Sequence, residues 1–149
     1  MRSFSLVLLR RLLFRTTPHQ QNSKGTGLSL YDHLSSQTLT TLERLLLHSL
    51  SHEPARAVRY KSVDTICDLA NNSMSRGRPW HALQAQVFSM TQNTDPGLRE
   101  GAYRVFAGCP NLVMDLQTDA VLGVFQKGLQ DTNVDVSHLF APFVIENSS

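Results

Sequence analysis

The chain has 149 residues, of which 41% are apolar and 17% charged, and its formal net charge at pH 7 is +2. This length suits one ordinary domain or three to four helical-hairpin repeats, and the apolar residues suffice for a core. The small net charge and the scattered basic residues argue against binding of DNA or RNA, which needs a concentrated basic surface.

The cysteines and the apolar runs limit the cellular setting. Cys67 and Cys109 both lie within apolar helical patterns, which indicates buried free thiols. Two cysteines cannot cross-link a secreted scaffold of this size, so a reducing compartment is favoured. No apolar run reaches the roughly 20 residues that a membrane-spanning helix needs, so we expect no membrane partner.

Residues 2–15 predict the first helix, because their apolar side chains recur at helical spacing. The same segment is rich in Arg, Ser and Leu, and no acidic residue precedes Asp32, which is also typical of a mitochondrial presequence. The residues alone leave both interpretations open. Residues 16–27 are polar and contain Pro18 and two glycines, which predicts a long surface loop.

The rest of the pattern is helical, with apolar residues three and four apart and with Ser, Asp or Pro at the starts. The expected helices begin near Ser35, Pro54, Pro79, Leu98, Thr118 or Asp119, and Val134. No alternating strand pattern of convincing length occurs, and Phe143-Val144-Ile145 is too short to count as one. The predicted fold class is therefore all-α.

The helices recur in pairs, and the second member of each pair begins alike. An acidic residue precedes an apolar anchor in each case, and aligning Val58, Leu98 and Val136 gives offsets of about 40 and about 38 residues. This is near the period of HEAT and armadillo arrays, in which hairpins stack because one hairpin cannot bury its own apolar face. We predict a HEAT/armadillo-type α-solenoid of about three to four helical-hairpin repeats.

Three residues of this pattern have an expected structural role between repeats. Arg59 and Arg99 follow the anchors, where an Arg one turn into the helix can reach a carboxylate of the adjacent repeat. Trp80 shares a helix with Phe88 and is expected in inter-repeat packing. The alternatives are partner binding for the two arginines and a hydrophobic recognition pocket for Trp80.

The sequence resembles the N-terminal HEAT repeats of karyopherin-β nuclear import receptors of the importin-beta-3 class, over residues 2 to about 136. The segments that carry the resemblance are 2–11 (RSFSLVLLRR), 68–70 (DLA), 79–80 (PW), 95–106 (DPGLREGAYRVF) and 124–131 (VFQKGLQD). The resemblance favours a helix of the array over a presequence at the N-terminus.

The resemblance also implies a fragment, because such receptors contain roughly twenty repeats, a long solenoid of stacked hairpins. The chain would start inside the second repeat. We expect a HEAT-repeat segment over 1–136, with a loop at about 16–34, and a divergent tail over 137–149, where Pro142 breaks the helix that the family would continue.

In such receptors the second helices line a concave face. The N-terminal repeats bind the GTP form of the small GTPase Ran, and surfaces further along bind import cargo; nucleoporins are further partners. This implies a protein of the cytoplasm and nucleus, with the mitochondrion as the alternative. The contact candidates on the inner helices, which a merely solvated face would also explain, are Tyr60, Lys61, Asp64, Asp68, Glu100 and Arg104.

The sequence offers no catalytic or cofactor motif. His48 and His52 have a metal-compatible spacing of four, but no third ligand accompanies them. Lys24-Gly25-Thr26-Gly27 lacks the preceding strand that a phosphate-binding loop needs. We therefore expect a protein without cofactor or enzymatic activity, and a generic HEAT scaffold without a transport role is the alternative function.

Overall fold

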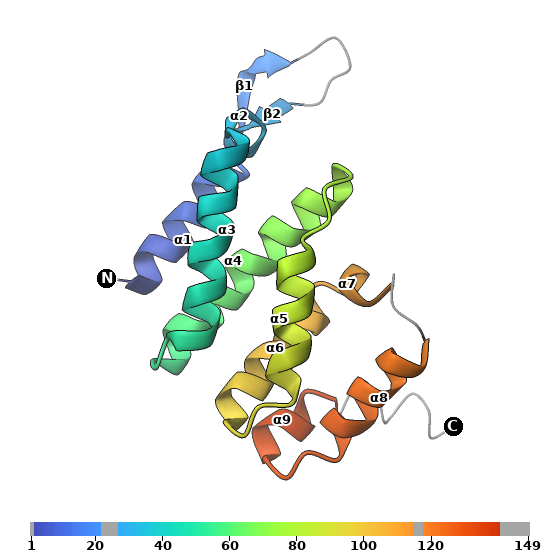
Figure 1. Cartoon of the computed structure of the whole chain (residues 1–149). Helices are drawn as coiled ribbons and strands as arrows, with labels where there is room; N and C mark the ends of the chain where they lie inside the picture. Colours follow the sequence, from blue (N-terminus) through green and yellow to red (C-terminus); the bar gives the residue numbers. More distant parts are fainter. Residues whose placement is uncertain (1, 22–26, 115–117, 141–149) are drawn as a thin grey trace. The chain divides into compact units, whose positions relative to one another are not determined.

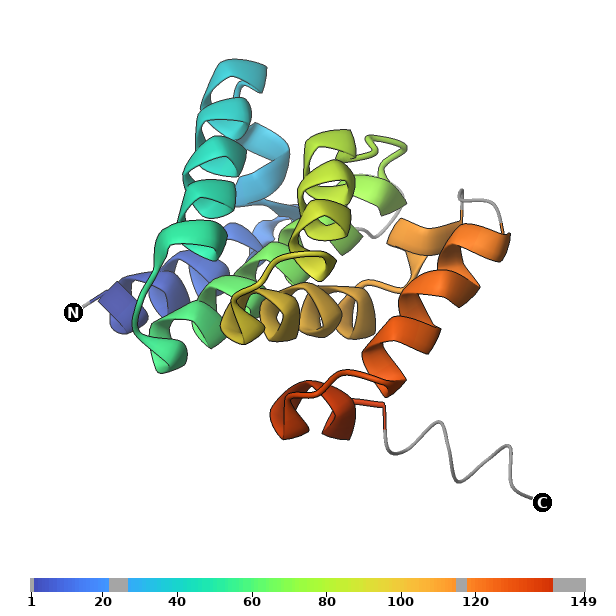
Figure 2. The same ribbon diagram turned by 60° about the horizontal axis from the view of Figure 1, so that its bottom comes forward.

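The computed structural model describes residues 2–21, 27–114 and 118–140 and is built mainly from helices (Figure 1 and Figure 2). The chain divides into two compact units, Met1–Asp68 and Leu69–Ser149. Helix α4 (Arg56–Ser75) begins in the first unit and ends in the second. In the described part of the chain, no helix combines the length and the apolar character that crossing a membrane requires.

The first unit combines helices with one short β-hairpin. Its elements in chain order are α1 (Arg2–Leu13), β1 (Thr16–Gln21), β2 (Gly27–Ser29), α2 (Leu30–His33), α3 (Ser36–His52) and the first part of α4. Figure 1 shows the hairpin beside α2, at the end of the unit where α3 begins.

The hairpin corrects the prediction of a loop over residues 16–27. β1 and β2 pair antiparallel, with Thr16 opposite Ser29 and Gln21 opposite Gly27. Both strands of a two-stranded sheet are edge strands, so Pro18 and an irregular polar pattern are tolerated there. Residues 22–26 of the predicted loop lie outside the described residues.

Short polar contacts fix where α2 and α3 begin. The backbone N–H and the hydroxyl of Ser29 both donate to Asp32 Oδ2, each at 2.8 Å. Ser35 is the N-cap of α3, and its Oγ accepts from the Thr38 N–H at 3.2 Å. A side-chain cap of this kind stabilises a helix by about 1 kcal/mol, and it confirms the predicted start.

Leucines of α3 at helical spacing contribute to the core of the first unit. Leu39, Leu46 and Leu50 are buried, whereas Leu45 is 54% exposed. The hydroxyls of Ser49 and Ser62 lie 2.8 Å apart and join α3 to α4. The other buried apolar side chains of this unit are Leu13, Tyr31, Val63, Ile66 and Cys67.

The second unit contains the end of α4 and further helices. These are α5 (His81–Thr91), α6 (Pro96–Gly108), α7 (Asn111–Met114), α8 (Thr118–Leu129) and α9 (Val134–His138). The predicted starts are confirmed within a few residues, and the one-turn helix α7 was not expected. Figure 2 shows α6 next to α5, with α9 below it. The predicted tail beyond Phe140 lies outside the described residues.

Packing in the second unit centres on α6. The rings of Phe88 and Phe106 meet edge-to-face with centroids 5.1 Å apart, which joins α5 to α6. Asn71 Nδ2 donates to the Gly108 carbonyl at 3.0 Å, and Gln84 Nε2 donates to the Leu112 carbonyl at 2.7 Å. These bonds satisfy backbone carbonyls at the end of α6 and in α7, which the helices themselves leave open.

Candidate functional site

An acidic side chain closes each of the three turns that the repeat pattern singles out. In each turn, the backbone N–H of the residue two positions after the acid donates to the acidic side chain. Ala55 donates to Glu53 Oε1 at 3.0 Å, Gly97 to Asp95 Oδ1 at 2.8 Å, and Asn133 to Asp131 Oδ1 at 2.9 Å. The first turns of helices have backbone N–H groups without intrahelical acceptors, and the helix dipole also stabilises a carboxylate at this end. The recurring acid therefore has a local structural use.

Arg99 connects two of these turns. Its Nε and Nη2 donate to Asp131 Oδ2 and Oδ1 at 2.6 and 2.8 Å, a bidentate ion pair. Its Nη1 donates to the carbonyls of Asn93 and Thr94, both at 3.0 Å. One guanidinium thus bridges the turn before α6 and the turn before α9, because its planar fork presents donors in several directions.

The ion pair changes the pKa of both partners. The hydrogen bond from Arg99 is the main reason why the pKa of Asp131 lies below its ordinary value. Burial raises that pKa, and the N–H of Asn133 lowers it further. The same hydrogen bond raises the pKa of Arg99, so both groups are held in their charged forms.

Arg59 occupies the place of Arg99 in the preceding repeat and makes part of the same contact. Its Nη1 donates to the Glu53 carbonyl at 3.0 Å, six residues back, as Arg99 does to Asn93. Its Nε is buried without a hydrogen-bond partner in the described residues. Glu53 itself is paired with Arg2 of α1 at 2.8 Å. Arg59 therefore closes its own turn.

The candidates on α4 are partly exposed and are engaged with neighbouring side chains. Arg56 donates to the Tyr60 hydroxyl, with the guanidinium 5.4 Å from the ring centroid. Lys61 lies 3.7 Å from Asp64, and both side chains are about half exposed. The structure thus brings Tyr60, Lys61 and Asp64 onto a charged and accessible stretch of α4.

Arg10 of α1 contacts the candidate residues of α4, although the sequence pattern did not single it out. Its guanidinium donates to Asp68 and lies 3.9 Å from the carboxylate of Asp64, so one cation pairs with two of the acidic candidates. The hydrogen bond to Asp68 raises the pKa of Arg10. Arg10 and Asp68 are 58 residues apart in the chain, and no local spacing links them.

A groove lies beside this ion pair in the first unit. Its lining comes from α1, from the residues that follow α1, and from α4: Val7, Arg10, Arg11, Phe14, Arg15, Lys61 and Asp68. The lining therefore combines four cationic side chains, one carboxylate and two apolar side chains.

The burial of Glu100 contradicts the expectation that it is an accessible contact residue. It is 3% exposed, and Arg104 donates to its Oε1 from Nε and Nη2, both at 3.2 Å. Helix α6 packs against both α5 and α9, so its buried residues cover most of its circumference. Arg104 is partly exposed and covers the buried carboxylate.

Trp80 is buried and immediately precedes α5. Its neighbours around a small cavity include Met74, Pro79 and Leu112, all within the second unit. This placement supports a packing role, and a packing role between repeats remains a prediction.

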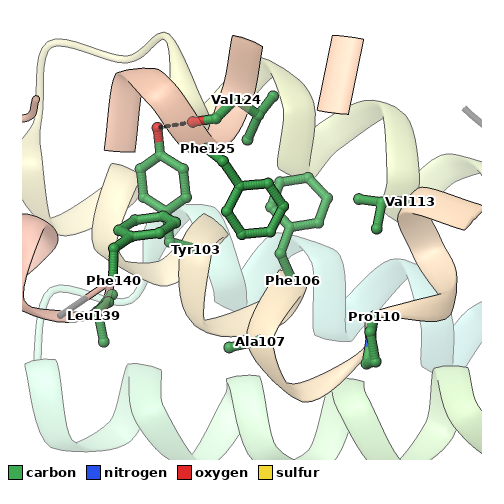
Figure 3. A pocket seen from close by; sticks show the side chains of 9 residues that line it. All are labelled: Tyr103, Phe106, Ala107, Pro110, Val113, Val124, Phe125, Leu139 and Phe140. Carbon is green, nitrogen blue, oxygen red and sulfur yellow. Dashed lines mark hydrogen bonds between the residues drawn. The ribbon is translucent and has the colours of Figure 1, made fainter. Parts of the chain in front are cut away.

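An apolar pocket of about 150 Å³ lies between α6, α8 and the end of α9 (Figure 3). Tyr103 and Phe125 both meet Phe140 edge-to-face, with centroids 4.8 and 5.6 Å away. The Tyr103 hydroxyl reaches the Val124 carbonyl at 3.5 Å, and burial raises its pKa. The remaining lining residues are Phe106, Ala107, Pro110, Val113 and Leu139.

The histidine pair on α3 makes local contacts. The rings of His48 and His52 stack with centroids 4.2 Å apart, and His52 Nδ1 lies 3.0 Å from the His48 carbonyl. Across the described ranges, no three His, Cys, Asp or Glu side chains gather in a way that could hold a metal ion.

Comparison with known proteins places this arrangement in a family. A family model described as IPO5-like, TPR repeats matches residues 54–145, which include α4 to α9. The chain belongs to this family. Importin subunit beta-3 of Saccharomyces cerevisiae (strain ATCC 204508 / S288c) is 24% identical to this IPO5-like chain over 135 residues, which are 90% of the chain and 12% of that protein.

Solved structures of Kap121p share the fold. The unbound protein matches with a TM-score of 0.73, and its complex with the extreme C-terminus of the protein phosphatase Cdc14p with 0.74. The complex of Kap121p with Nup53p gives 0.72. Sequence identity is 22% in each case, over 92% of this chain and 12% of Kap121p.

These findings confirm the predicted all-α helical-repeat fold and the resemblance to karyopherin-β receptors of the importin-beta-3 class. TPR and HEAT repeats are both stacked helical hairpins, and the offsets of about 40 and 38 residues lie nearer the HEAT period. The IPO5-like chain spans about 12% of the length of the relatives that it matches.

Proposed function

We propose that this chain is a protein-binding HEAT-repeat segment of a nuclear import receptor, and that it binds the GTP form of Ran and import cargo. The observation that carries the proposal is the IPO5-like family match over residues 54–145. Structures of the relative Kap121p have been solved in complex with protein partners, among them Ste12p and Nup53p. Nucleoporins are accordingly included among the proposed partners, and the proposed location is the cytoplasm and nucleus.

The charged stretch of α4 supports a protein contact rather than catalysis. Lys61 and Asp64 are about half exposed, and Asp68 is one-third exposed beside Arg10. Exposed charges of both signs favour rapid and selective encounter with a complementary protein surface. Glu100 is buried and is therefore proposed as a support for Arg104 rather than as a contact residue.

Helix α1 is proposed as part of this array and not as a presequence. Leu13 is buried, and the ion pairs of Arg2 with Glu53 and of Arg10 with Asp68 hold α1 against the rest of the first unit. A transient targeting segment has no need of such contacts.

The test is binding of the full chain to Ran loaded with GTP and, in parallel, with GDP. We expect selective binding of the GTP form. Charge reversals Lys61→Glu and Asp64→Lys should each weaken it about tenfold, which corresponds to 1.4 kcal/mol. The matched control Arg44→Glu changes an exposed residue of α3 in the same unit and should bind as the unmodified chain does.

The two functional alternatives separate in this experiment. No binding to either form by a chain shown to be helical by circular dichroism would contradict the Ran proposal and favour a generic scaffold. Selective binding that none of the reversals changes would retain the transport role but remove α4 as the contact surface.

A further inference from the structure

The groove beside α1 carries two arginines that the rest of the structure does not use. Arg11 and Arg15 are exposed and make no ion pair or hydrogen bond with any other described residue. The other charged lining residues are engaged: Arg10 with Asp68, and Lys61 with Asp64. An excess of positive charge is thus concentrated at one concave surface of a chain whose overall charge is only +2.

The groove also has an apolar surface. Val7 and Phe14 line it together with the cationic side chains. A ligand that suits both features has negative charges flanking an apolar side chain. Arg11 also lies in the last turn of α1, where the helix dipole favours cations, so the basic residues are stable in this position.

We propose that this groove binds an acidic peptide segment of a partner protein, with carboxylates against Arg11 and Arg15 and an apolar side chain against Val7 and Phe14. Charge complementarity selects the partner: guanidinium groups pair with carboxylates through short, charge-assisted hydrogen bonds. Lys61 and Asp68 of the α4 surface proposed for Ran also line this groove. The inference does not depend on the transport role, because Arg11 and Arg15, which select the acidic peptide, are not part of that surface.

Two other anionic partners fit the groove less well. Binding to a nucleic-acid backbone gains its strength from many phosphate contacts along an extended basic surface, and the unengaged cations here are few and local. Attraction to an anionic membrane depends on clusters of about four to eight basic residues facing a flat surface. An open groove favours a chain segment that can lie in it over a flat bilayer.

The test is fluorescence anisotropy with the full chain and a fluorescein-labelled 12-residue peptide of Asp and Glu around a central Leu-Phe pair. We expect saturable binding that weakens as NaCl rises from about 50 to about 300 mM, since salt screens exposed charges. The same peptide with Lys in place of each acid should not bind. Replacement of Leu-Phe by Ser-Ser should weaken binding, because Val7 and Phe14 then have no apolar partner in the peptide.

Charge-reversal variants locate the site. Arg11→Glu and Arg15→Glu each replace an attraction by a repulsion and should weaken binding about tenfold. Arg44→Glu on α3 makes the same charge change elsewhere on the first unit and should shift binding by less than about twofold. If a reversed variant loses its helical circular dichroism, Arg11→Gln and Arg15→Gln provide the measurement, with an expected loss of about threefold.

Three outcomes would overturn the proposal: equal weakening by all three reversals, which indicates unspecific charge attraction; binding that Arg11 and Arg15 do not affect; or tighter association with single-stranded DNA or with vesicles containing phosphatidylserine than with the peptide. Loss of Ran binding alone leaves this result unchanged, so the two proposals fail separately.

Discussion

The Arg99–Asp131 ion pair is the contact whose removal should destabilise the second unit most clearly. The side chains are 16% and 6% exposed, and two guanidinium nitrogens donate to two carboxylate oxygens at 2.6 and 2.8 Å. Asp131→Ala leaves Nε and Nη2 of a largely buried cation without acceptors. It also removes the acceptor of the Asn133 N–H.

The expected cost follows from this geometry. Breaking a buried ion pair by removing one partner costs about 3–5 kcal/mol, and this pair lies at the lower end because Arg99 keeps its bonds to the carbonyls of Asn93 and Thr94. We therefore expect Asp131→Ala to lower the free energy of unfolding by about 3 kcal/mol. Arg99→Lys should cost less, because Lys keeps the charge but loses the bidentate geometry.

The assay is urea denaturation followed by circular dichroism, arranged as a double-mutant cycle of Arg99→Ala, Asp131→Ala and the double variant. A coupling of about 2 kcal/mol is expected for a direct contact. Lys127→Ala is the control in the same unit: its bond to Gln92 is exposed, and its loss should cost less than about 0.5 kcal/mol. Additive effects of the two substitutions, with no coupling, would refute the assignment of this pair as a stabilising link between turns.

Three further predictions concern the second unit. Because the folded pKa of Asp131 is lowered, its contribution to stability should be complete above the ordinary value of 3.8 and should be lost as the pH falls through the lowered folded pKa. Asp131→Asn should therefore flatten the acid limb of a stability–pH curve. Gly128→Ala should destabilise the unit by about 1–3 kcal/mol, since the added methyl would overlap the ring of Phe140, whereas Gly123→Ala meets open space and should be neutral or stabilising in thermal unfolding. Burial raises the pKa of Cys109 to about 11, so its thiol should resist alkylation by iodoacetamide at pH 8 until denaturant is added; rapid modification of the native chain would contradict its burial.

Helix positions were predictable from the sequence because their signals are local. Ser35 caps α3 through the Thr38 N–H, and α6 begins at Pro96 after the N-cap Asp95, two residues before the predicted start near Leu98. The β-hairpin was not predictable in the same way, because its pairing joins residues 16–21 to 27–29 without an alternating apolar pattern. A short helix such as α7 likewise lacks the length over which periodicity becomes visible.

The candidate surface was only partly predictable for a related reason. Spacing along α4 places Lys61 and Asp64 on an accessible side, and the structure agrees. It cannot reveal that Arg10 neutralises Asp68 from another helix, nor that Glu100 is buried, since both depend on which elements surround each helix. Arg10, Arg11 and Arg15 are close in the sequence, but only the structure shows that Lys61 of α4 joins them and that Arg11 and Arg15 have no ionic partner among the described residues.

The three repeat turns distinguish what each repeat needs from what connects neighbouring repeats. All three have the acidic side chain, which satisfies an N–H that the turn leaves open. The first two also have an Arg that bonds the carbonyl six residues back, whereas in the third Ser137 holds this place and bonds within its own helix to Val134. The third turn is instead held by Arg99 from the preceding repeat. The acid therefore recurs in all three turns, and the Arg is an addition: Arg59 bonds within its own turn, whereas Arg99 also reaches the carboxylate of the following turn.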